Sequence, residues 1–287
     1  MSVHFDVEPL DGPGFGARIT GLKLTDMGEA AFDELYATWL EHGLLIFPDQ
    51  HMEPEEQVDV ARRFGPLEVK LFAISNVRDD GSVRTSDEDD LVKILKGNMG
   101  WHHDSTYMPL QAKGAVFSAH VVPEEGGETG FADMRQAYDA LDDDTKAKLE
   151  GLTALHSLHY SQMKAGFRQK EKDSEYIGYG LDERPPVRRQ LVKTHPETGR
   201  KSLLIGRHAF GVSGMSEKES EDFVDGLNEF AGAGGWTYHH KWTPGEVVLW
   251  DNRCLMHRAC PWDMTKPRVM YHSRIAGDPQ SEAEVAA

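Results

Sequence analysis

Apolar residues at helical spacing mark the N-terminal part of the chain. Between residues 25 and 43 they recur three, four, seven and eight positions apart, which predicts an amphipathic helix. Thr25 or Asp26 is expected to cap this helix, and Gly43 to end it in the left-handed conformation. A second helix is predicted from Pro54 to Gly65, with a proline in its first turn.

Most later apolar positions come in short runs, which are typical of strands. The four-residue turn 196–199 separates two such runs and predicts a hairpin. Ser216 and Glu219 form a capping-box pattern and predict a third helix. Helices near the N-terminus followed by many strands favour an α+β barrel or sandwich over alternating βαβ units. The predicted strands are 44–47, 114–122, 191–195, 201–205, 236–242, 246–251 and 268–275.

We expect one domain that spans residues 1–287, because no linker, repeat or low-complexity tract interrupts the pattern. Two charged segments, residues 72–92 and 166–186, are candidate lids, since long loops in compact domains often close over ligands. The tail from about residue 277 is expected to be loose.

Charge narrows the possible partners. The 287 residues contain 31 Lys and Arg against 48 Asp and Glu, a net charge of −17, which argues against nucleic acids and anionic membranes as partners. No apolar run is long enough for a transmembrane helix, and the first residues lack the pattern of a signal peptide. Two cysteines, Cys254 and Cys260, make no disulfide framework, so a cytoplasmic location is expected.

The tripeptide His102-His103-Asp104 is the strongest chemical signal. In an extended segment His102 and Asp104 share one face, so that an imidazole and a carboxylate can bind the same metal ion. His257 is the best candidate for a third ligand. Two histidines and one carboxylate form the facial triad of non-haem Fe(II) oxygenases, which leaves positions open for other ligands. Because the chain has 14 histidines, the spacing alone is weak evidence.

Three further residues fit a site for a dicarboxylic co-substrate. Arg268 opens the last predicted strand, where its guanidinium can hold a carboxylate in bidentate fashion. Thr129, after a pair of glycines, can offer a hydroxyl to the same carboxylate, and Trp250 can form a wall. The alternatives are a surface arginine, an ordinary turn residue and a core aromatic residue.

These residues lie in motifs that resemble a known family. The sequence is similar to the taurine/2,4-D dioxygenase family of Fe(II)/2-oxoglutarate oxygenases over nearly its whole length. Within that family it resembles the aryloxyalkanoate dioxygenases of the (S)-phenoxypropionate type. The motifs that carry the resemblance are GLLIFPDQ at 43–50, GNMGWHHDSTYMP at 97–109, FADMR at 131–135 and WDNR at 250–253.

The resemblance implies a double-stranded β-helix, or jelly roll, with flanking helices. It implies three iron ligands, and three residues that hold the co-substrate 2-oxoglutarate, with O₂ as the oxidant. It also implies a small anionic substrate and a homo-oligomer, from trimer to hexamer. The implied iron ligands are His102, Asp104 and His257, and the implied 2-oxoglutarate residues are Thr129, Trp250 and Arg268.

Candidates for the substrate side are less sharply defined. Where several relatives place a second arginine, this chain has His272, with Arg274 two positions further on the same strand face. Lys70 and Asn98 match polar positions near the substrate in relatives, and Lys70 is equally consistent with a solvated lysine. His208 is a further candidate for the wall of the pocket.

The function that the resemblance implies is hydroxylation of the ether-bearing carbon of an aryloxyalkanoate. The products are a phenol, a 2-oxo acid, succinate and CO₂. Within the same chemistry, a taurine-like alkylsulfonate or an alkyl sulfate is the alternative substrate. Outside it, the metal-ligand set also suits a zinc hydrolase, and the fold a non-catalytic jelly-roll binding protein.

Overall fold

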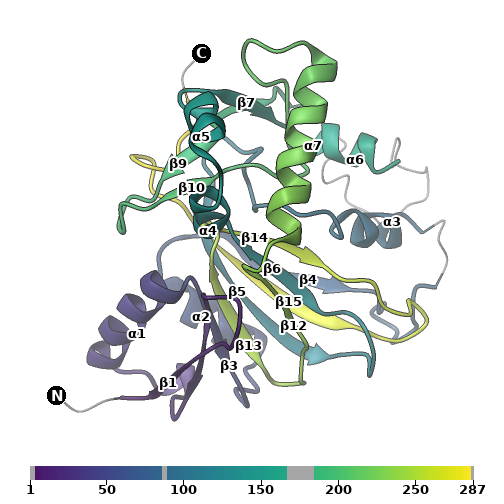
Figure 1. Ribbon diagram of the computed structural model, residues 1–287. Helices are drawn as coiled ribbons and strands as arrows, with labels where there is room; N and C mark the ends of the chain where they lie inside the picture. The colour runs from purple at the N-terminus through teal and green to yellow at the C-terminus, as the bar shows by residue number, and fades with distance from the viewer. Residues whose placement is uncertain (1–3, 86–88, 167–183, 286–287) are drawn as a thin grey trace.

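The computed structural model describes residues 4–85, 89–166 and 184–285, which form a jelly roll with helices packed outside its sheets (Figure 1). The predicted fold class is confirmed. The large sheet is mainly antiparallel, and a smaller sheet lies beside it. In spatial order the large sheet contains β1 (Asp6–Pro9), β2 (Ala17–Thr20), β3 (Leu44–Phe47), β13 (Val247–Asp251), β5 (Ala112–Val121), β15 (Val269–Ala276) and β4 (Leu67–Ser75).

The smaller sheet has β6 at its centre, paired with β12 on one side and β14 on the other. Two further small sheets lie toward the top of Figure 1. These remaining strands are β12 (Thr237–His240), β6 (Thr129–Asp133), β14 (Leu255–Ala259), β11 (Ala209–Phe210), β7 (Thr153–His156), β8 (Val187–Gln190), β9 (Val192–Thr194) and β10 (Lys201–Leu203).

The three predicted helices are present as α1, α2 and α7, whereas α3 to α6 were not predicted. The first ends at Gly43, whose φ of 73° is left-handed. Its expected cap is wrong: Gly28 precedes it without a side-chain cap, because a short 3₁₀ turn takes up the positions of Thr25 and Asp26. The helices are η1 (Leu24–Asp26), α1 (Glu29–His42), α2 (Pro54–Arg63), α3 (Asp90–Gly97), α4 (Met134–Asp139), α5 (Asp143–Leu149), α6 (Leu158–Lys164) and α7 (Glu217–Ala233).

Two local predictions from turn and cap chemistry are confirmed. The capping box at the start of α7 is formed in both directions between Ser216 and Glu219. Strands β9 and β10 pair as the predicted hairpin, with Lys201 opposite Thr194. Both features depend only on residues close together in the sequence, which is why the pattern reveals them.

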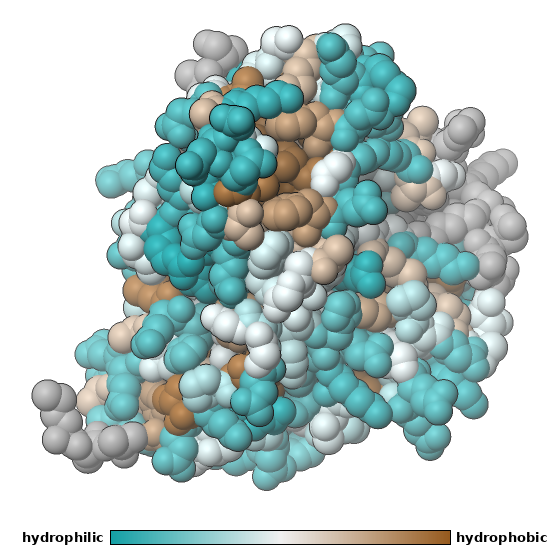
Figure 2. Space-filling model, viewed as in Figure 1, coloured by the Kyte–Doolittle hydropathy of each residue, from teal (hydrophilic) through white to brown (hydrophobic). Residues whose placement is uncertain are grey.

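Apolar side chains form three buried clusters around the sheets. One lies where α1 and α2 cover the large sheet, one lies under α4 and α7, and one involves both sheets around Phe131 and Trp250. Figure 2 shows brown apolar atoms between α5 and α7, on a face that is otherwise mostly teal. The third cluster gives the site between the sheets a rigid apolar wall.

The tail was expected to be loose, and the structure corrects this. Glu282 is 1% exposed, and backbone hydrogen bonds hold the segment from Ser281 to Val285 in place. Of the candidate lids, residues 167–183 and 86–88 lie outside the described residues. Across the ranges that the structure describes, no helix is both long and apolar enough to cross a membrane.

Candidate metal centre and its cavity

Backbone pairing brings the predicted ligands together. His102 donates its backbone N–H to the carbonyl of His257 at 3.0 Å, and His257 donates back to His102 at 2.8 Å. This isolated bridge adds the segment around residue 102 to the edge of the smaller sheet beside β14. The ligating atoms of His102, Asp104 and His257 all lie within 4.8 Å of one another, and all three residues are buried.

The local orientation of each ligand suits a metal ion. The Nδ1 of His102 lies 2.8 Å from the carbonyl of Gly100, which leaves its Nε2 for coordination. Asp104 Oδ2 lies 3.7 Å from His257 Nε2 and has no hydrogen-bond partner. Ser105, the next residue, has a left-handed φ of 57°, a strained conformation of the kind that collects at ligand sites.

Electrostatics keep the triad in the protonation states that a metal requires. Burial lowers the pKa of His257 to about 4 and that of His102 well below its usual value, so both imidazoles are neutral at pH 7. Burial by itself raises the pKa of the Asp104 carboxyl, but Arg274 and the nearby histidines outweigh it and hold the pKa well below its usual range. Two neutral imidazoles and one carboxylate result.

Asn252 holds the segment that carries Asp104. Its Oδ1 accepts the backbone N–H of Asp104 at 2.7 Å, and its Nδ2 donates to the carbonyls of Asp104 at 3.0 Å and Ala112 at 2.8 Å. Its own carbonyl lies 2.8 Å from His103 Nδ1. Asn252 belongs to the WDNR motif that the sequence contains, but the motif gives no indication of this contact.

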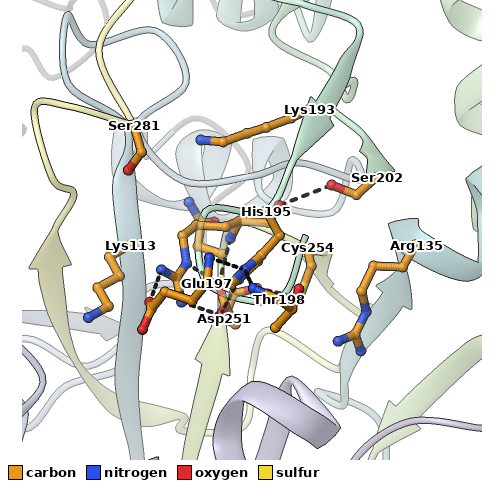
Figure 3. A network of polar contacts seen from close by, with 12 residues as sticks. Lys113, Arg135, Lys193, His195, Glu197, Thr198, Ser202, Asp251, Cys254 and Ser281 are labelled. Carbon is orange, nitrogen blue, oxygen red and sulfur yellow. Dashed lines mark hydrogen bonds and ion pairs between the residues drawn. The ribbon is translucent and has the colours of Figure 1, made fainter. Parts of the chain in front are cut away.

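The residues on either side of Asn252 form a separate buried network (Figure 3). The Asp251 carboxylate accepts from the Arg253 guanidinium at 2.8 and 2.6 Å and pairs with His195 Nε2 at 3.0 Å. The Nδ1 of His195 accepts from the backbone of Glu197 and Thr198, so its proton is on Nε2. This network fixes the strand end from which Asn252 reaches Asp104.

Both candidates for the substrate anion on β15 lie beside the Asp104 carboxylate. His272 Nε2 lies 3.4 Å from Asp104 Oδ2, and Arg274 Nη2 lies 3.4 Å from Asp104 Oδ1. Arg274 Nη1 also donates to Ser105 Oγ at 2.9 Å and lies 3.4 Å from Glu68. Both residues line the cavity and contact Asp104, and their role in binding the substrate anion stays a prediction.

The candidates for the co-substrate site line the same cavity. Arg268 is 2% exposed; its Nη2 donates to the carbonyl of Gly127 at 3.2 Å, while its Nε has no hydrogen-bond partner. Thr129 Oγ1 accepts from Trp242 Nε1 at 2.9 Å, so its hydroxyl proton is available to a ligand. The ring centroids of Trp250 and His257 lie 4.7 Å apart.

Gly127 leaves room for this arginine. Its φ is +71°, and a Cβ at this position would lie 3.3 Å from the Nε of Arg268. Burial lowers the pKa of Arg268 to about 10, so the guanidinium stays charged at pH 7. The cavity therefore holds a buried cation that no carboxylate of the described residues neutralises by an ion pair.

The other substrate-side candidates are placed differently. Asn98 and His208 line the cavity, and His208 Nδ1 lies 2.8 Å from Ser161 Oγ. Lys70 is exposed on β4 and is not among the residues that line the cavity, so its role near the substrate stays a prediction.

Sequence reasoning missed the apolar wall of the cavity. Its members come from β4, α3 and β5 and line the same cavity as the triad. Periodicity alone does not separate a pocket wall from ordinary core, and part of the wall lies in a segment that the charge pattern marks as loop. The apolar residues are Phe72, Ile74, Leu91, Leu95 and Phe117, and the missed polar ones include Tyr107 and Asn252.

A jelly roll that holds two histidines and one carboxylate around an open cavity defines a class, the mononuclear iron oxygenases. Residues 6–274 match the family described as "Taurine catabolism dioxygenase TauD, TfdA family", and the chain belongs to this family. The resemblance that the motifs indicate is thereby confirmed.

Particular relatives are similar over nearly their full length. The chain is 62% identical over 287 residues to an (S)-phenoxypropionate/alpha-ketoglutarate-dioxygenase of Sphingobium herbicidovorans, and all of both chains is covered. It is 35% identical to an alpha-ketoglutarate-dependent 2,4-dichlorophenoxyacetate dioxygenase of Cupriavidus pinatubonensis, over 93% of this chain and 96% of that one. A crystal structure of AAD-2 with Mn(II) and N-oxalylglycine has a TM-score of 0.89 at 35% identity, with 99% of this chain and 100% of that chain covered.

Proposed function

We propose that the protein hydroxylates the ether-bearing carbon of an aryloxyalkanoate, with Fe(II), 2-oxoglutarate and O₂. One oxygen atom of O₂ enters the substrate and the other enters succinate, while C1 of 2-oxoglutarate leaves as CO₂. The hydroxylated ether carbon then releases a phenol and becomes the carbonyl carbon of a 2-oxo acid. The observation that carries this proposal is the triad facing a cavity that contains the uncompensated cation of Arg268.

The residues present fit a ferrous ion. His102, Asp104 and His257 offer two neutral nitrogens and one carboxylate oxygen, and the partnerless Oδ2 of Asp104 is satisfied by a cation. Bound there, iron supplies the oxygen activation that side chains lack. The chain itself keeps the three ligands on one face, leaving the other face open to the cavity.

The residues also fit 2-oxoglutarate. Arg268 and Thr129 supply a guanidinium and a hydroxyl for the far carboxylate of 2-oxoglutarate. A guanidinium can bind a carboxylate through two parallel hydrogen bonds. Trp250, stacked on His272 with ring centroids 5.4 Å apart, forms a rigid wall and excludes water. The N-oxalylglycine bound to AAD-2, a dicarboxylic compound, supports the same ligand class for this chain.

An aryloxyalkanoate has an apolar aryl ring and an anionic carboxylate, and the cavity offers suitable surroundings for both. Phe72, Leu95 and Phe117 offer an apolar wall for an aryl ring, and arginines along the cavity offer positive charge for a carboxylate in a protein of net charge −17. The substrate named for the relative from Sphingobium herbicidovorans supports a phenoxypropionate.

The test is turnover with defined substrates. Purified protein with Fe(II), 2-oxoglutarate and O₂ is incubated with (S)- or (R)-2-phenoxypropionate, phenoxyacetate, taurine or an alkyl sulfate, and both succinate and phenol are measured. We expect equal amounts of succinate and phenol with a phenoxyalkanoate. Succinate with sulfite or sulfate release would instead assign a sulfonate or sulfate ester, and no iron-dependent succinate would contradict the proposal.

Two further proposals concern assembly and location. We propose a homo-oligomer of three to six subunits, which light scattering tests directly. We also propose a cytoplasmic protein without a nucleic-acid partner, supported by the buried free thiols of Cys254 and Cys260 and by the net charge of −17.

A further inference from the structure

The segment after β15 crosses the loop that follows Asp104. Gln111 donates its backbone N–H to the carbonyl of Glu282 at 3.0 Å, and Glu284 donates to the carbonyl of Pro109 at 2.9 Å. An isolated bridge also joins Leu110 to Ala283. We call residues 278–285 the C-terminal strap, because they bind one edge of the loop formed by residues 105–111.

Arg189 on β8 joins the strap to the loop. It is 3% exposed, and its Nε donates to the carbonyl of Thr106 at 3.1 Å. Its two terminal nitrogens donate to the carbonyls of Met108 at 2.5 Å and of Glu282 at 2.8 Å. One guanidinium therefore holds the loop on both sides of residue 107 and holds the strap at the same time. The rigid fork of an arginine is suited to three such bonds.

A buried ion pair anchors the strap itself. The Glu282 carboxylate is 1% exposed and pairs with Lys193 of β9. Figure 3 shows Lys193 extending toward the segment that carries Ser281. The strap follows Gly277, where a Cβ would collide with the carbonyl oxygen of Gln111, so glycine permits the close approach.

Tyr107, the residue between the two clamped carbonyls, lines the cavity. The centroid of its ring lies 4.8 Å from the ring centroid of His208. The ring centroid of His208 lies 5.7 Å from that of His102. Asp104 has separate anchors in Asn252 and Arg274. The position of Tyr107 therefore depends on the strap and on Arg189, whereas the metal ligand beside it does not.

We propose that the C-terminal strap and Arg189 are positioning elements for the organic substrate: they hold Tyr107 in the cavity wall and thereby set the affinity for the substrate, but not for the metal or 2-oxoglutarate. The proposal deepens the proposed function and rests on it for the identity of the substrate. The clamp itself is independent of that function and can be observed without any ligand.

The experiment compares two neighbouring arginines. Arg189→Met removes the clamp, while Arg188→Met is the matched control, because Arg188 is only partly buried and its guanidinium donates to Thr153 Oγ1 at 3.0 Å. Hydrogen exchange measured by mass spectrometry on ligand-free protein is expected to accelerate across residues 104–111 in Arg189→Met only. A peptide covering β6 serves as the internal reference.

Kinetics then test the consequence for recognition. In Arg189→Met we expect kcat/KM for the phenoxyalkanoate to fall by about ten- to a hundredfold, chiefly through KM, since a displacement of 1 Å in a substrate-positioning group can cost about that much. The Michaelis constant for the co-substrate and the metal affinity are expected to stay within about twofold of wild type, the scatter of substitutions away from a ligand. Arg188→Met is expected to match wild type throughout.

Two other variants guard against a folding failure. A chain ending at Gly277 removes the strap, and Glu282→Gln removes only the charge of its anchor. Both are expected to shift exchange and substrate KM in the same direction as Arg189→Met, with the smaller effect in Glu282→Gln. Unchanged exchange over 104–111, or equal rises in the Michaelis constants for substrate and co-substrate, would overturn the proposal. If wild type turns over no phenoxyalkanoate, the proposed function fails, while the exchange measurement still decides whether the clamp exists.

Discussion

Two carboxylates, Asp104 and Asp251, are both hidden from solvent but differ in their surroundings. Asp251 is 1% exposed, and both of its oxygens accept hydrogen bonds, from Arg253 and from His195. Asp104 is 6% exposed, and its Oδ2 accepts none, although His272 lies 3.4 Å away. The two residues are connected through Asn252, which follows one in the chain and clamps the backbone of the other.

The difference distinguishes structure from function. A buried polar atom without a partner costs about 1–3 kcal/mol, so a fold keeps one mainly where a ligand completes it. In the closed cluster, both carboxylate oxygens of Asp251 accept hydrogen bonds from the protein, so this cluster stabilises the fold. The open cluster around Asp104 has an oxygen that accepts no hydrogen bond, which fits the metal-binding role that we propose for it.

Removing the open carboxylate gives the largest expected effect. Asp104→Ala is expected to lower metal affinity and turnover by more than about a hundredfold, because even outer partners of metal ligands contribute about 10–100-fold. The loss of apo stability should be smaller than in Asp251→Asn, since Asp104 Oδ2 accepts no hydrogen bond and Arg274 keeps its contacts with Ser105 and Glu68. Metal titration and chemical unfolding of the apo protein measure both. A large loss of apo stability would remove the distinction between the two clusters.

Removing the closed carboxylate is expected to do the reverse. Asp251→Asn leaves the buried Arg253 with only the partly exposed Glu197 as a charged partner, so the free energy of unfolding is expected to fall by about 3–5 kcal/mol. The exposed pair of Asp139 and Arg200 is the control, with about 0–1 kcal/mol for Asp139→Asn. Urea denaturation measures both variants, and similar losses in the two would contradict the assignment.

The same substitution has a pH signature. Burial raises the pKa of Asp251, but Arg253 and His195 outweigh it and hold the folded-state pKa well below its usual range. The stabilisation is therefore complete above about pH 4, the unfolded value, and is lost as the pH falls through the folded value. In Asp251→Asn the free energy of unfolding should fall less steeply with decreasing pH. The slope should correspond to up to about one fewer proton taken up on unfolding than in wild type.

Asn252 tests the connection between the two clusters. Asn252→Ala removes the three bonds that hold Asp104 and Ala112, so we expect metal affinity to fall by about 10–100-fold. The expected loss of unfolding free energy, about 1–3 kcal/mol, is smaller than for Asp251→Asn. Metal titration measures the change in metal affinity, and urea denaturation measures the change in the free energy of unfolding. Unchanged metal affinity would show that Asp104 does not depend on its bonds to Asn252.

The smallest effect is expected at the solvent edge of the closed cluster. Glu197 bonds Arg253 and Tyr36, but its side chain is 34% exposed. Glu197→Gln is therefore expected to cost about 0–1 kcal/mol, as exposed pairs do, and to leave metal affinity unchanged. A loss as large as that of Asp251→Asn would extend the closed cluster to the surface.

The sequence was sufficient for features that depend on neighbours. The capping box of Ser216, the helix end at Gly43 and the pairing of β9 with β10 follow from residues a few positions apart. The family motifs also pointed to His102, Asp104 and His257, which the structure brings within 4.8 Å, although their role as iron ligands stays a prediction.

Contacts between distant segments were out of reach. Strand alternation placed His272 and Arg274 on one face, but could not show that the carboxylate opposite that face belongs to Asp104. The tail was misjudged for the same reason: a charged, polar stretch suggests solvent, whereas Glu282 is buried against Lys193, which is far away in the sequence.

The reciprocal bonds between His102 and His257 have a consequence for synthesis. The two residues lie more than half the chain apart, and proteins are made from the N-terminus onward. During synthesis, His102 and Asp104 therefore leave the ribosome long before His257 does. With His102, Asp104 and His257 as the proposed iron ligands, tight iron binding requires that β14 has docked, so the protein would take up iron late in its synthesis.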